Sequence, residues 1–180
     1  GGKLFESYYH STCGGTTFRG ADAFGAPRIA ALEPVSCGAC TASPYYRWSA
    51  AIPVAEVTGA LASLCERLPI DLGEVLALEP LERGPGGHAA YLRVVHSRGS
   101  FEIDAMRFRD RCSARGYPSL RSTSFAAKRA GGEFRFEGRG WGHGVGMCQM
   151  GAKAFAERRA NARWILNHYY PSSEVVRLWD

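Results

Sequence analysis

The spacing of apolar residues predicts one amphipathic helix in the first half of the chain. Between residues 53 and 68, apolar side chains recur at helical intervals, at Val54, Val57, Leu61, Leu64, Cys65 and Leu68. Pro53 suits the first turn of this helix, because a backbone N–H there would have no intrahelical partner. We therefore expect a helix over residues 53–68 with its apolar face buried.

Shorter apolar runs predict strands further along the chain, over residues 74–79, 90–96 and 100–104. The last two runs are joined by Ser97-Arg98-Gly99, which favours a hairpin. Residues 133–137 alternate so that their two phenylalanines share one strand face. These hairpin signals predict a mainly antiparallel sheet.

Helical spacing returns near the C-terminus. Apolar positions after residue 150 predict a helix that ends near Arg159, and Asn161 can begin a second helix. With 180 residues, 46% of them hydrophobic, the chain can bury one sizeable core. We expect a single α+β domain over residues 1–180, with a mainly antiparallel sheet and several helices.

The segment 138–147, GRGWGHGVGM, has glycine at every second position. In an extended strand the five glycines would share one face, and Arg139, Trp141 and His143 would project from the other. One interpretation is a groove wall that presents a cation, an indole and an imidazole to a bulky ligand. The other is a helix or strand packed tightly on bare backbone. The pattern alone favours neither, although it does not fit a phosphate-binding loop, since no Gly-Lys-Ser/Thr follows.

Composition and charge narrow the class of protein. The formal net charge is +5, but 22 Lys and Arg are interspersed with 17 Asp and Glu, so we expect no nucleic-acid partner. No apolar stretch approaches the length of a membrane span, so we expect at most a peripheral membrane association. Because the chain does not begin with methionine, we interpret it as a mature or trimmed fragment.

Three of the six cysteines lie in segments without helical or strand periodicity: Cys13, and Cys37 and Cys40 in a CxxC pair. Three such thiolates supply most of a closed tetrahedral zinc site, which would hold the surrounding loops in place. Cys148 is our first choice for the fourth ligand, and His10 is the second. A disulfide and a redox CxxC are the alternatives.

His10 and His143 are the two histidines that an apolar core does not explain, so both are candidates to contact a ligand. A structural role is the usual alternative for a lone histidine. The order of residues provides neither a Ser-His-Asp triad nor an HExxH metal helix. The carboxylates likewise include no pair that stands out as a glycosidase-type acid and base.

Several motifs together resemble the SpoIID/LytB family of bacterial cell-wall proteins. They are YYHSTCGGTT, the CxxC followed by SPYYRW, the FR near Arg109, SLRSTSF, and GRGWGHGVGMCQMGA with ILNHYYP after it. The resemblance covers nearly the whole chain and implies an extracytoplasmic domain acting on peptidoglycan, in the periplasm, cell wall or forespore intermembrane space. In the sporulation branch it implies a lytic transglycosylase that cleaves glycan strands without stem peptides and leaves 1,6-anhydro-muramic acid ends.

That chemistry requires one acid that protonates the departing glycosidic oxygen and then accepts the proton of the C6 hydroxyl. The resemblance implies that this glutamate lies upstream of Gly1, and Glu6 does not match its context. The amidase-enhancer branch implies a non-catalytic alternative, a module that binds wall glycan or stimulates an N-acetylmuramoyl-L-alanine amidase. A zinc-stabilised domain that binds another glycan is a third possibility.

The resemblance also implies a substrate groove, built by His10, Ser11, Thr12, Arg139, Trp141, His143 and Gln149. The Trp141 indole would offer a stacking face to a sugar ring. The family usually has serine where this chain has Cys13 and Cys148, and a subgroup with cysteine at both positions also has the CxxC. The resemblance therefore favours Cys148 as the fourth ligand of a structural zinc beside the groove.

Overall fold

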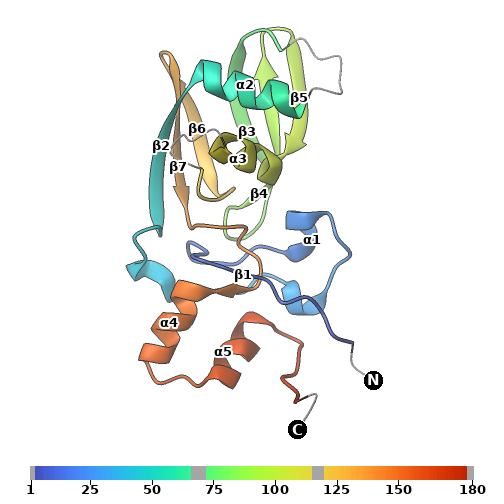
Figure 1. Cartoon of the computed structure of the whole chain (residues 1–180), viewed down its shortest axis with the longest axis vertical. Helices are drawn as coiled ribbons and strands as arrows, with labels where there is room; N and C mark the ends of the chain where they lie inside the picture. The colour runs from blue at the N-terminus through green and yellow to red at the C-terminus, as the bar shows by residue number, and fades with distance from the viewer. Residues whose placement is uncertain (1–2, 66–71, 115–119, 178–180) are drawn as a thin grey trace. The chain divides into compact units, whose positions relative to one another are not determined.

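The computed structural model describes residues 3–65, 72–114 and 120–177 (Figure 1). The chain divides into two compact units. Both ends of the chain, Gly1–Tyr46 and Gly140–Asp180, form the terminal unit, and Arg47–Arg139 forms the central unit.

The predicted α+β class, with mainly antiparallel sheets and several helices, is confirmed. The helices are α1 (Gly20–Phe24), α2 (Val54–Leu64), α3 (Ala105–Ala114), α4 (Gln149–Glu157) and α5 (Ala162–Tyr169), with short 3-10 helices η1 (Ala30–Leu32) and η2 (Cys40–Ala42). The strands are β1 (Tyr9–His10), β2 (Arg47–Pro53), β3 (Val75–Arg83), β4 (Ala89–His96), β5 (Gly99–Asp104), β6 (Phe125–Ala130), β7 (Glu133–Arg139) and β8 (Met147–Cys148).

The central unit contains two three-stranded antiparallel sheets, with strand orders β2-β7-β6 and β3-β4-β5. Helices α2 and α3 pack against each other and against these strands (Figure 1). Alternation along β7 buries Phe134 and Phe136 and exposes Arg135 between them. These phenyl rings join one continuous apolar core, which includes Leu61, Leu92 and Phe108.

The predicted helix over residues 53–68 is confirmed as α2, with Pro53 as its N-cap residue. Val57, Ala60 and Leu61 form its buried face, while residues 66–68 of the expected range lie outside the described residues. The hairpin expected around residue 98 is also confirmed, because β4 and β5 pair antiparallel with Val94 opposite Phe101.

The terminal unit has little regular structure for its size. Its only strand pair in the described residues is parallel, with Tyr9 opposite Met147 and His10 opposite Cys148. The two helices expected near the C-terminus are confirmed as α4 and α5. Most of the remaining described chain in this unit runs as loops, which must be held by contacts other than a sheet ladder.

The extended strand expected over residues 138–147 is wrong beyond Arg139, where β7 ends. Four glycines of the repeat adopt left-handed φ values: Gly140 (77°), Gly142 (112°), Gly144 (80°) and Gly146 (69°). Left-handed residues reverse the local direction of the backbone, so alternating them with ordinary residues produces a folded loop. We call residues 140–146 the glycine loop.

The N-terminal segment approaches the glycine loop closely. The backbones of Thr12 and Trp141 exchange hydrogen bonds, at 3.1 and 2.7 Å, and Met147 N–H donates to Tyr8 O at 3.0 Å. A Cβ atom built on Gly142 would lie 2.8 Å from the Cβ of His10. The packing of backbone on bare backbone, one of the two interpretations of the repeat, therefore describes how this loop meets residues 8–13.

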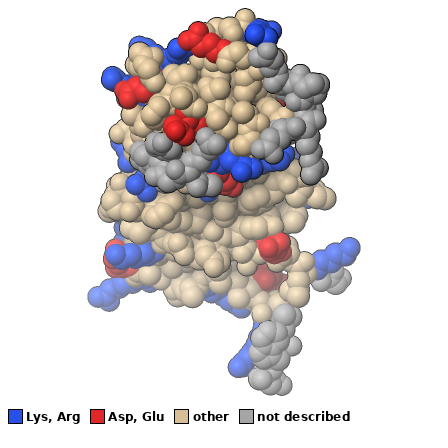
Figure 2. Space-filling model, turned by 45° about the horizontal axis from the view of Figure 1, so that its top comes forward, with Lys and Arg blue, Asp and Glu red and all other residues tan. Residues whose placement is uncertain are grey.

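Charged side chains of both signs share the protein surface. On the face shown in Figure 2, Lys and Arg lie among Asp and Glu, as their interspersion in the sequence led us to expect. Ion pairs such as Arg28–Glu33, at 2.6 Å, and Arg93–Glu102, at 3.1 Å, join some of them. Among the described residues, we find no helix with the length and apolar character needed to cross a membrane.

Candidate functional site

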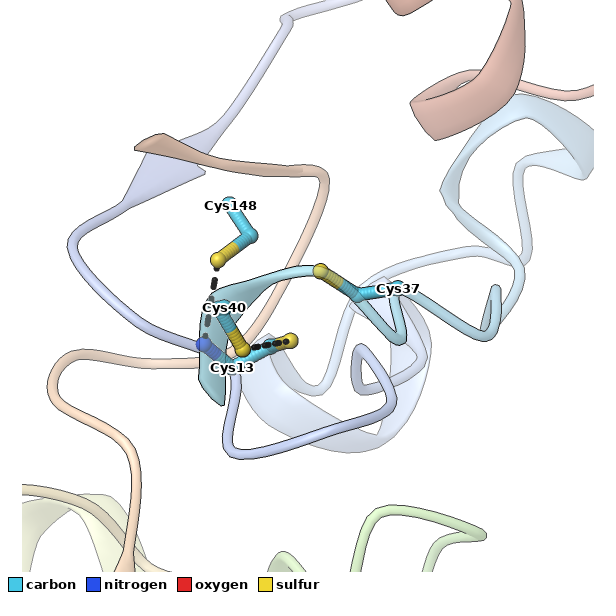
Figure 3. Close-up of side chains that lie close together, drawn as sticks. All are labelled: Cys13, Cys37, Cys40 and Cys148. Carbon is cyan, nitrogen blue, oxygen red and sulfur yellow. Dashed lines mark hydrogen bonds between the residues drawn. The ribbon is translucent and has the colours of Figure 1, made fainter. Parts of the chain in front are cut away.

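Four cysteines from separate parts of the terminal unit converge on one point (Figure 3). Cys13 follows β1, Cys37 and Cys40 come from the CxxC segment, and Cys148 ends β8. Their Sγ atoms all lie within 4.8 Å of one another, and all four residues are buried. The pairing of β1 with β8 brings Cys13 close to Cys148 across 135 positions of sequence.

Backbone N–H groups point at the sulfur atoms of this cluster. Cys13 N–H donates to Cys148 Sγ at 3.3 Å, and Gly15 N–H donates to Cys13 Sγ at 3.4 Å. Cys148 is also the N-cap residue of α4, and its Sγ accepts from Gly151 N–H at 3.3 Å. Such donors, and the N-terminus of a helix, stabilise negative charge on a sulfur atom.

The four thiols differ strongly in acidity because they hydrogen-bond one another in a buried space. Bonding to Cys13 lowers the pKa of Cys40 to about 7 and holds the pKa of Cys37 well below its usual range. The pKa of Cys13 is raised, mainly by its interaction with Cys148. Four thiolates this close repel one another, so the cluster requires either shared protons or a cation.

The donor set fits a tetrahedral metal ion. Zn–S bonds of about 2.3 Å place the sulfurs of a tetrahedral site about 3.8 Å apart, and the Cys13 and Cys40 Sγ atoms lie 3.5 Å apart. All six cysteines are free, which does not support the disulfide alternative. Since four protein sulfurs would complete the coordination, such a site leaves no position for substrate.

Tyr169 supports the cluster from α5. Its hydroxyl lies 3.1 Å from Cys37 Sγ, and its side chain is fully buried. Gly151 makes this approach possible, because a Cβ atom there would collide with both Tyr169 Oη and Cys37 Sγ. The glycine of the CQMGA motif and the tyrosine of ILNHYYP therefore position one cysteine.

His10 is not part of the cysteine cluster. Both candidate histidines, His10 and His143, form hydrogen bonds with backbone groups. His10 Nδ1–H donates to Val145 O at 3.0 Å. His143 Nδ1 accepts from Val145 N–H at 3.0 Å, which assigns the ring proton to Nε2, and this atom donates to Tyr9 O at 3.1 Å. The two rings meet edge to face at 5.6 Å. These bonds fix the shape of the glycine loop against β1.

The other residues that the resemblance assigns to a groove in this unit differ in accessibility. Trp141 is 39% exposed and packs edge to face on Tyr45, with ring centroids 4.4 Å apart. Gln149 is exposed at the first position of α4. Thr12 is fully buried, and its hydroxyl bonds Ser43 Oγ at 2.7 Å. Ser11 is partly buried beside Thr12, so Trp141 and Gln149 are the side chains best placed to meet a ligand.

Arg139 belongs to the central unit, where it lines a cavity of about 590 Å³ together with Arg47 and Arg83. Arg47 and Arg139 are direct cross-strand partners on β2 and β7, an arrangement of like charges that destabilises a sheet. None of the three pairs with a carboxylate at salt-bridge distance among the described residues, and Glu137 is the acid that also lines the cavity. Partial burial lowers the pKa of Arg83.

Sequence reasoning missed Arg47 and Arg83. Strand pairing between β2 and β7 joins residue 47 to residue 139, and Arg83 arrives from β3 by donating to Phe125 O at 2.6 Å. No local spacing could indicate such a group, although Arg47 does lie within the SPYYRW motif.

The sequence comparisons agree with the motifs. An uncharacterized protein of Brachyspira hyodysenteriae is 29% identical over 177 residues, which cover 97% of this chain and 44% of that protein. The stage II sporulation protein D of Bacillus amyloliquefaciens is 28% identical over 173 residues, 96% of this chain and 45% of the relative. The amidase enhancer of Bacillus subtilis is 40% identical over 61 residues, 34% of this chain and 9% of the enhancer.

Fold and site together define an α+β protein with a buried four-cysteine cluster in its terminal unit. The chain belongs to the family described as a domain of unknown function (DUF8618), whose model matches residues 37–146, and its relatives show that it is SpoIID/LytB-like. The chain spans just under half the length of the first two of these relatives.

Proposed function

We propose that this chain binds peptidoglycan glycan as part of a lytic transglycosylase that acts on strands without stem peptides. The observation that supports this most directly is Trp141, an exposed indole on a loop whose backbone is fixed on both sides. Rigid, exposed aromatic faces suit the flat C–H faces of sugar rings. The relatives named stage II sporulation protein D support a cell-wall role and an extracytoplasmic location.

In this proposal, residues 1–180 bind and orient the glycan, and the catalytic glutamate belongs to the full protein upstream of Gly1. His143 does not transfer protons, because both of its ring nitrogens are engaged with backbone. In the terminal unit, Trp141 supplies a stacking surface and Gln149 supplies an exposed amide at the start of α4. In the central unit, Arg139 supplies a cation for acidic groups of the strand.

We propose that Cys13, Cys37, Cys40 and Cys148 hold a structural zinc ion. Four buried sulfurs that all lie within 4.8 Å of one another support this assignment. The ion would cross-link the loop after β1, the CxxC segment and β8. The β1–β8 pair has only two residues on each strand, so by itself it holds these segments together weakly. In this proposal the ion only cross-links these segments and takes no part in catalysis.

The amidase enhancer relative favours a second candidate function. Its 61-residue match has the highest identity of the relatives described above, at 40%. In this second function, the chain is a non-catalytic module that binds wall glycan or stimulates an N-acetylmuramoyl-L-alanine amidase. The two candidate functions differ in whether glycosidic bonds are cleaved.

The deciding experiment incubates the full-length protein and the 180-residue chain separately with stem-peptide-free glycan strands. Mass spectrometry then measures 1,6-anhydro ends. Anhydro ends from the full-length protein alone would support the transglycosylase and the upstream acid. Glycan binding without cleavage by either form would favour the enhancer function.

A matched pair of variants tests the site itself. Trp141→Ala should weaken glycan binding roughly two- to tenfold, since an aromatic stacking contact contributes about 0.5–1.5 kcal/mol beyond area burial. Tyr91→Ala removes another exposed aromatic ring, 43% exposed on β4 of the central unit, and should leave binding unchanged. Equal binding by both variants would remove Trp141 from the site.

A further inference from the structure

The turn between α4 and α5 contains a cavity that none of the motifs predicted. Its volume is about 410 Å³, and its walls are Phe155, Arg158, Arg159, Ala160, Asn161 and Trp164. The lining comprises two aromatic rings, two guanidinium groups and an amide, with no carboxylate. Trp164 is 48% exposed, so part of its ring is open to a ligand.

The Trp164 ring is held in a fixed orientation. It stacks on His168 with the planes at 7° and the centroids 5.3 Å apart, and Phe155 meets it edge on at 5.0 Å. Asn161 fixes the backbone below it, because its side-chain oxygen caps α5 by accepting from Trp164 N–H at 2.9 Å. A ring that is already ordered loses little entropy when a ligand stacks on it.

Arg159 occupies a backbone position that normally belongs to glycine. At the end of α4, Arg159 N–H bonds Ala156 O and Ala160 N–H bonds Phe155 O, which is the Schellman arrangement. The residue at this position is left-handed, and Arg159 has φ 69°. A non-glycine residue in that conformation is strained, and such strain is often found at functional sites.

Arg158 and Arg159 are not paired with an acid among the residues that the structure describes. Both side chains are exposed. Glu157, the acid next to them in sequence, lies 3.7 Å from Lys153 instead. The cavity therefore combines a net positive charge with an aromatic face.

We propose that this cavity binds a pyranose ring that carries a free carboxylate. Trp164 stacks on the ring, and Arg158 and Arg159 pair with the carboxylate through charge-assisted hydrogen bonds. Resting on the proposed function, the ligand is a muramic acid residue whose lactyl group is not amide-linked to a stem peptide. The cavity then selects stripped strands, because an attached peptide removes the charge that the arginines recognise.

NMR titration of the 180-residue chain with two oligosaccharides tests this site. One is the stem-free tetrasaccharide of alternating N-acetylglucosamine and N-acetylmuramic acid. The other is the fully N-acetylated chitotetraose, which has the same number of rings, no carboxylate and no charge. The indole N–H signal of Trp164 is identified, among four tryptophans, by its loss in Trp164→Phe. We expect the acidic tetrasaccharide to shift this signal, with an affinity about tenfold higher than that of chitotetraose.

Three variants distinguish a loss of the arginine charges from a loss of folding. The double change Arg158→Gln and Arg159→Gln should abolish the preference for the acidic tetrasaccharide, whereas Lys153→Gln, which removes a charge one turn away, should retain it. Arg159→Gly should bind the acidic tetrasaccharide several-fold more weakly while melting at an equal or higher temperature, because glycine relieves the left-handed strain.

The two proposals can fail separately. Equal shifts of the Trp164 signal by both oligosaccharides, or no shift by either, would overturn the cavity assignment even if anhydro ends are released by the full-length protein. A selective shift without any glycosidic cleavage would support the cavity and remove the transglycosylase function.

Discussion

The central and terminal units reach a defined structure by different means. In the central unit, apolar residues from two sheets and two helices bury one another in a continuous core. In the terminal unit, long loops surround four buried cysteines and a glycine loop whose backbone contacts residues 8–13 directly. The core of the central unit depends on the volumes of its apolar side chains. The terminal unit depends on a few cysteines and glycines whose properties no other residue type supplies.

Removing one cysteine of the cluster should have the largest effect and should be confined to the terminal unit. Structural zinc sites contribute about 10 kcal/mol or more to the folding of small zinc peptides. We therefore expect Cys37→Ser to lose the metal and to collapse the NMR amide signals of the terminal unit, while those of the central unit stay dispersed. Metal content is measured by inductively coupled plasma mass spectrometry.

Cys65→Ser is the control for this change, since Cys65 is a buried cysteine of the central unit at the end of α2. It should retain one metal ion per chain. A Cys37→Ser protein with full metal content and unchanged signals in the terminal unit would contradict the proposed zinc site.

Shortening a side chain in the core of the central unit should have the opposite result to the cysteine change, because stability should fall while the metal is retained. Phe136 is fully buried on β7 in the central unit, and replacing a buried phenylalanine by alanine costs about 3–5 kcal/mol. We expect Phe136→Ala to lower the free energy of unfolding by about that amount and to keep its metal, measured by urea denaturation and metal analysis. Arg135→Ala, on the exposed face of the same strand, should change stability by less than about 0.5 kcal/mol. Loss of metal from Phe136→Ala would mean that the two units do not fold separately.

Gly151→Ala should weaken the terminal unit through crowding. In most helices alanine is favoured over glycine by about 1 kcal/mol, but here the new Cβ atom would collide with Tyr169 Oη and Cys37 Sγ. We expect a loss of about 1–3 kcal/mol in stability and faster loss of metal to a chelator. Gly132→Ala is the matched control, because a Cβ atom there meets nothing within 4 Å. If Gly151→Ala were the more stable of the two, the crowding argument would be wrong.

The same contrast explains what the sequence could predict. Helix α2 and the β4–β5 hairpin could be predicted from periodicity and turn residues. Their side chains alternate between the core and the solvent, and this alternation leaves a periodic pattern in the sequence. The loop setting of Cys13, Cys37 and Cys40 predicted most of a metal site. Cys148 was the first choice for the fourth ligand and His10 the second, and Cys148 lies with the other three cysteines.

The glycine loop could not be derived in this way. An alternating glycine pattern is compatible with a strand, and only the parallel pairing of β1 with β8 places Tyr8 and Thr12 against it. That pairing joins residues 138 positions apart, Tyr9 and Met147, which no local pattern specifies. The Arg47–Arg139 register and the α4–α5 cavity also depend on tertiary arrangement, so neither was predicted.

The smallest effect on stability should come from removing an ion pair in the loops of the terminal unit. Hydrogen bonding to Arg28, aided by Arg19, lowers the pKa of Glu33. Since the folded pKa is below the unfolded value of about 4.3, this carboxylate stabilises the fold above that pH and loses its contribution as pH falls through the folded pKa. Glu33→Gln should therefore lower the free energy of unfolding at pH 7 by up to about 1 kcal/mol.

The difference between Glu33→Gln and the parent chain should shrink with added salt and with falling pH, because Arg28 is largely exposed and the charge is screened. Urea denaturation at pH 7 and at pH 3, each in low and high salt, measures it. A loss of several kcal/mol at pH 7 would show that these loops rely on surface ion pairs as much as on the cysteine cluster. The terminal unit would then owe its stability to many weak surface contacts, and the contrast with the central unit would no longer hold.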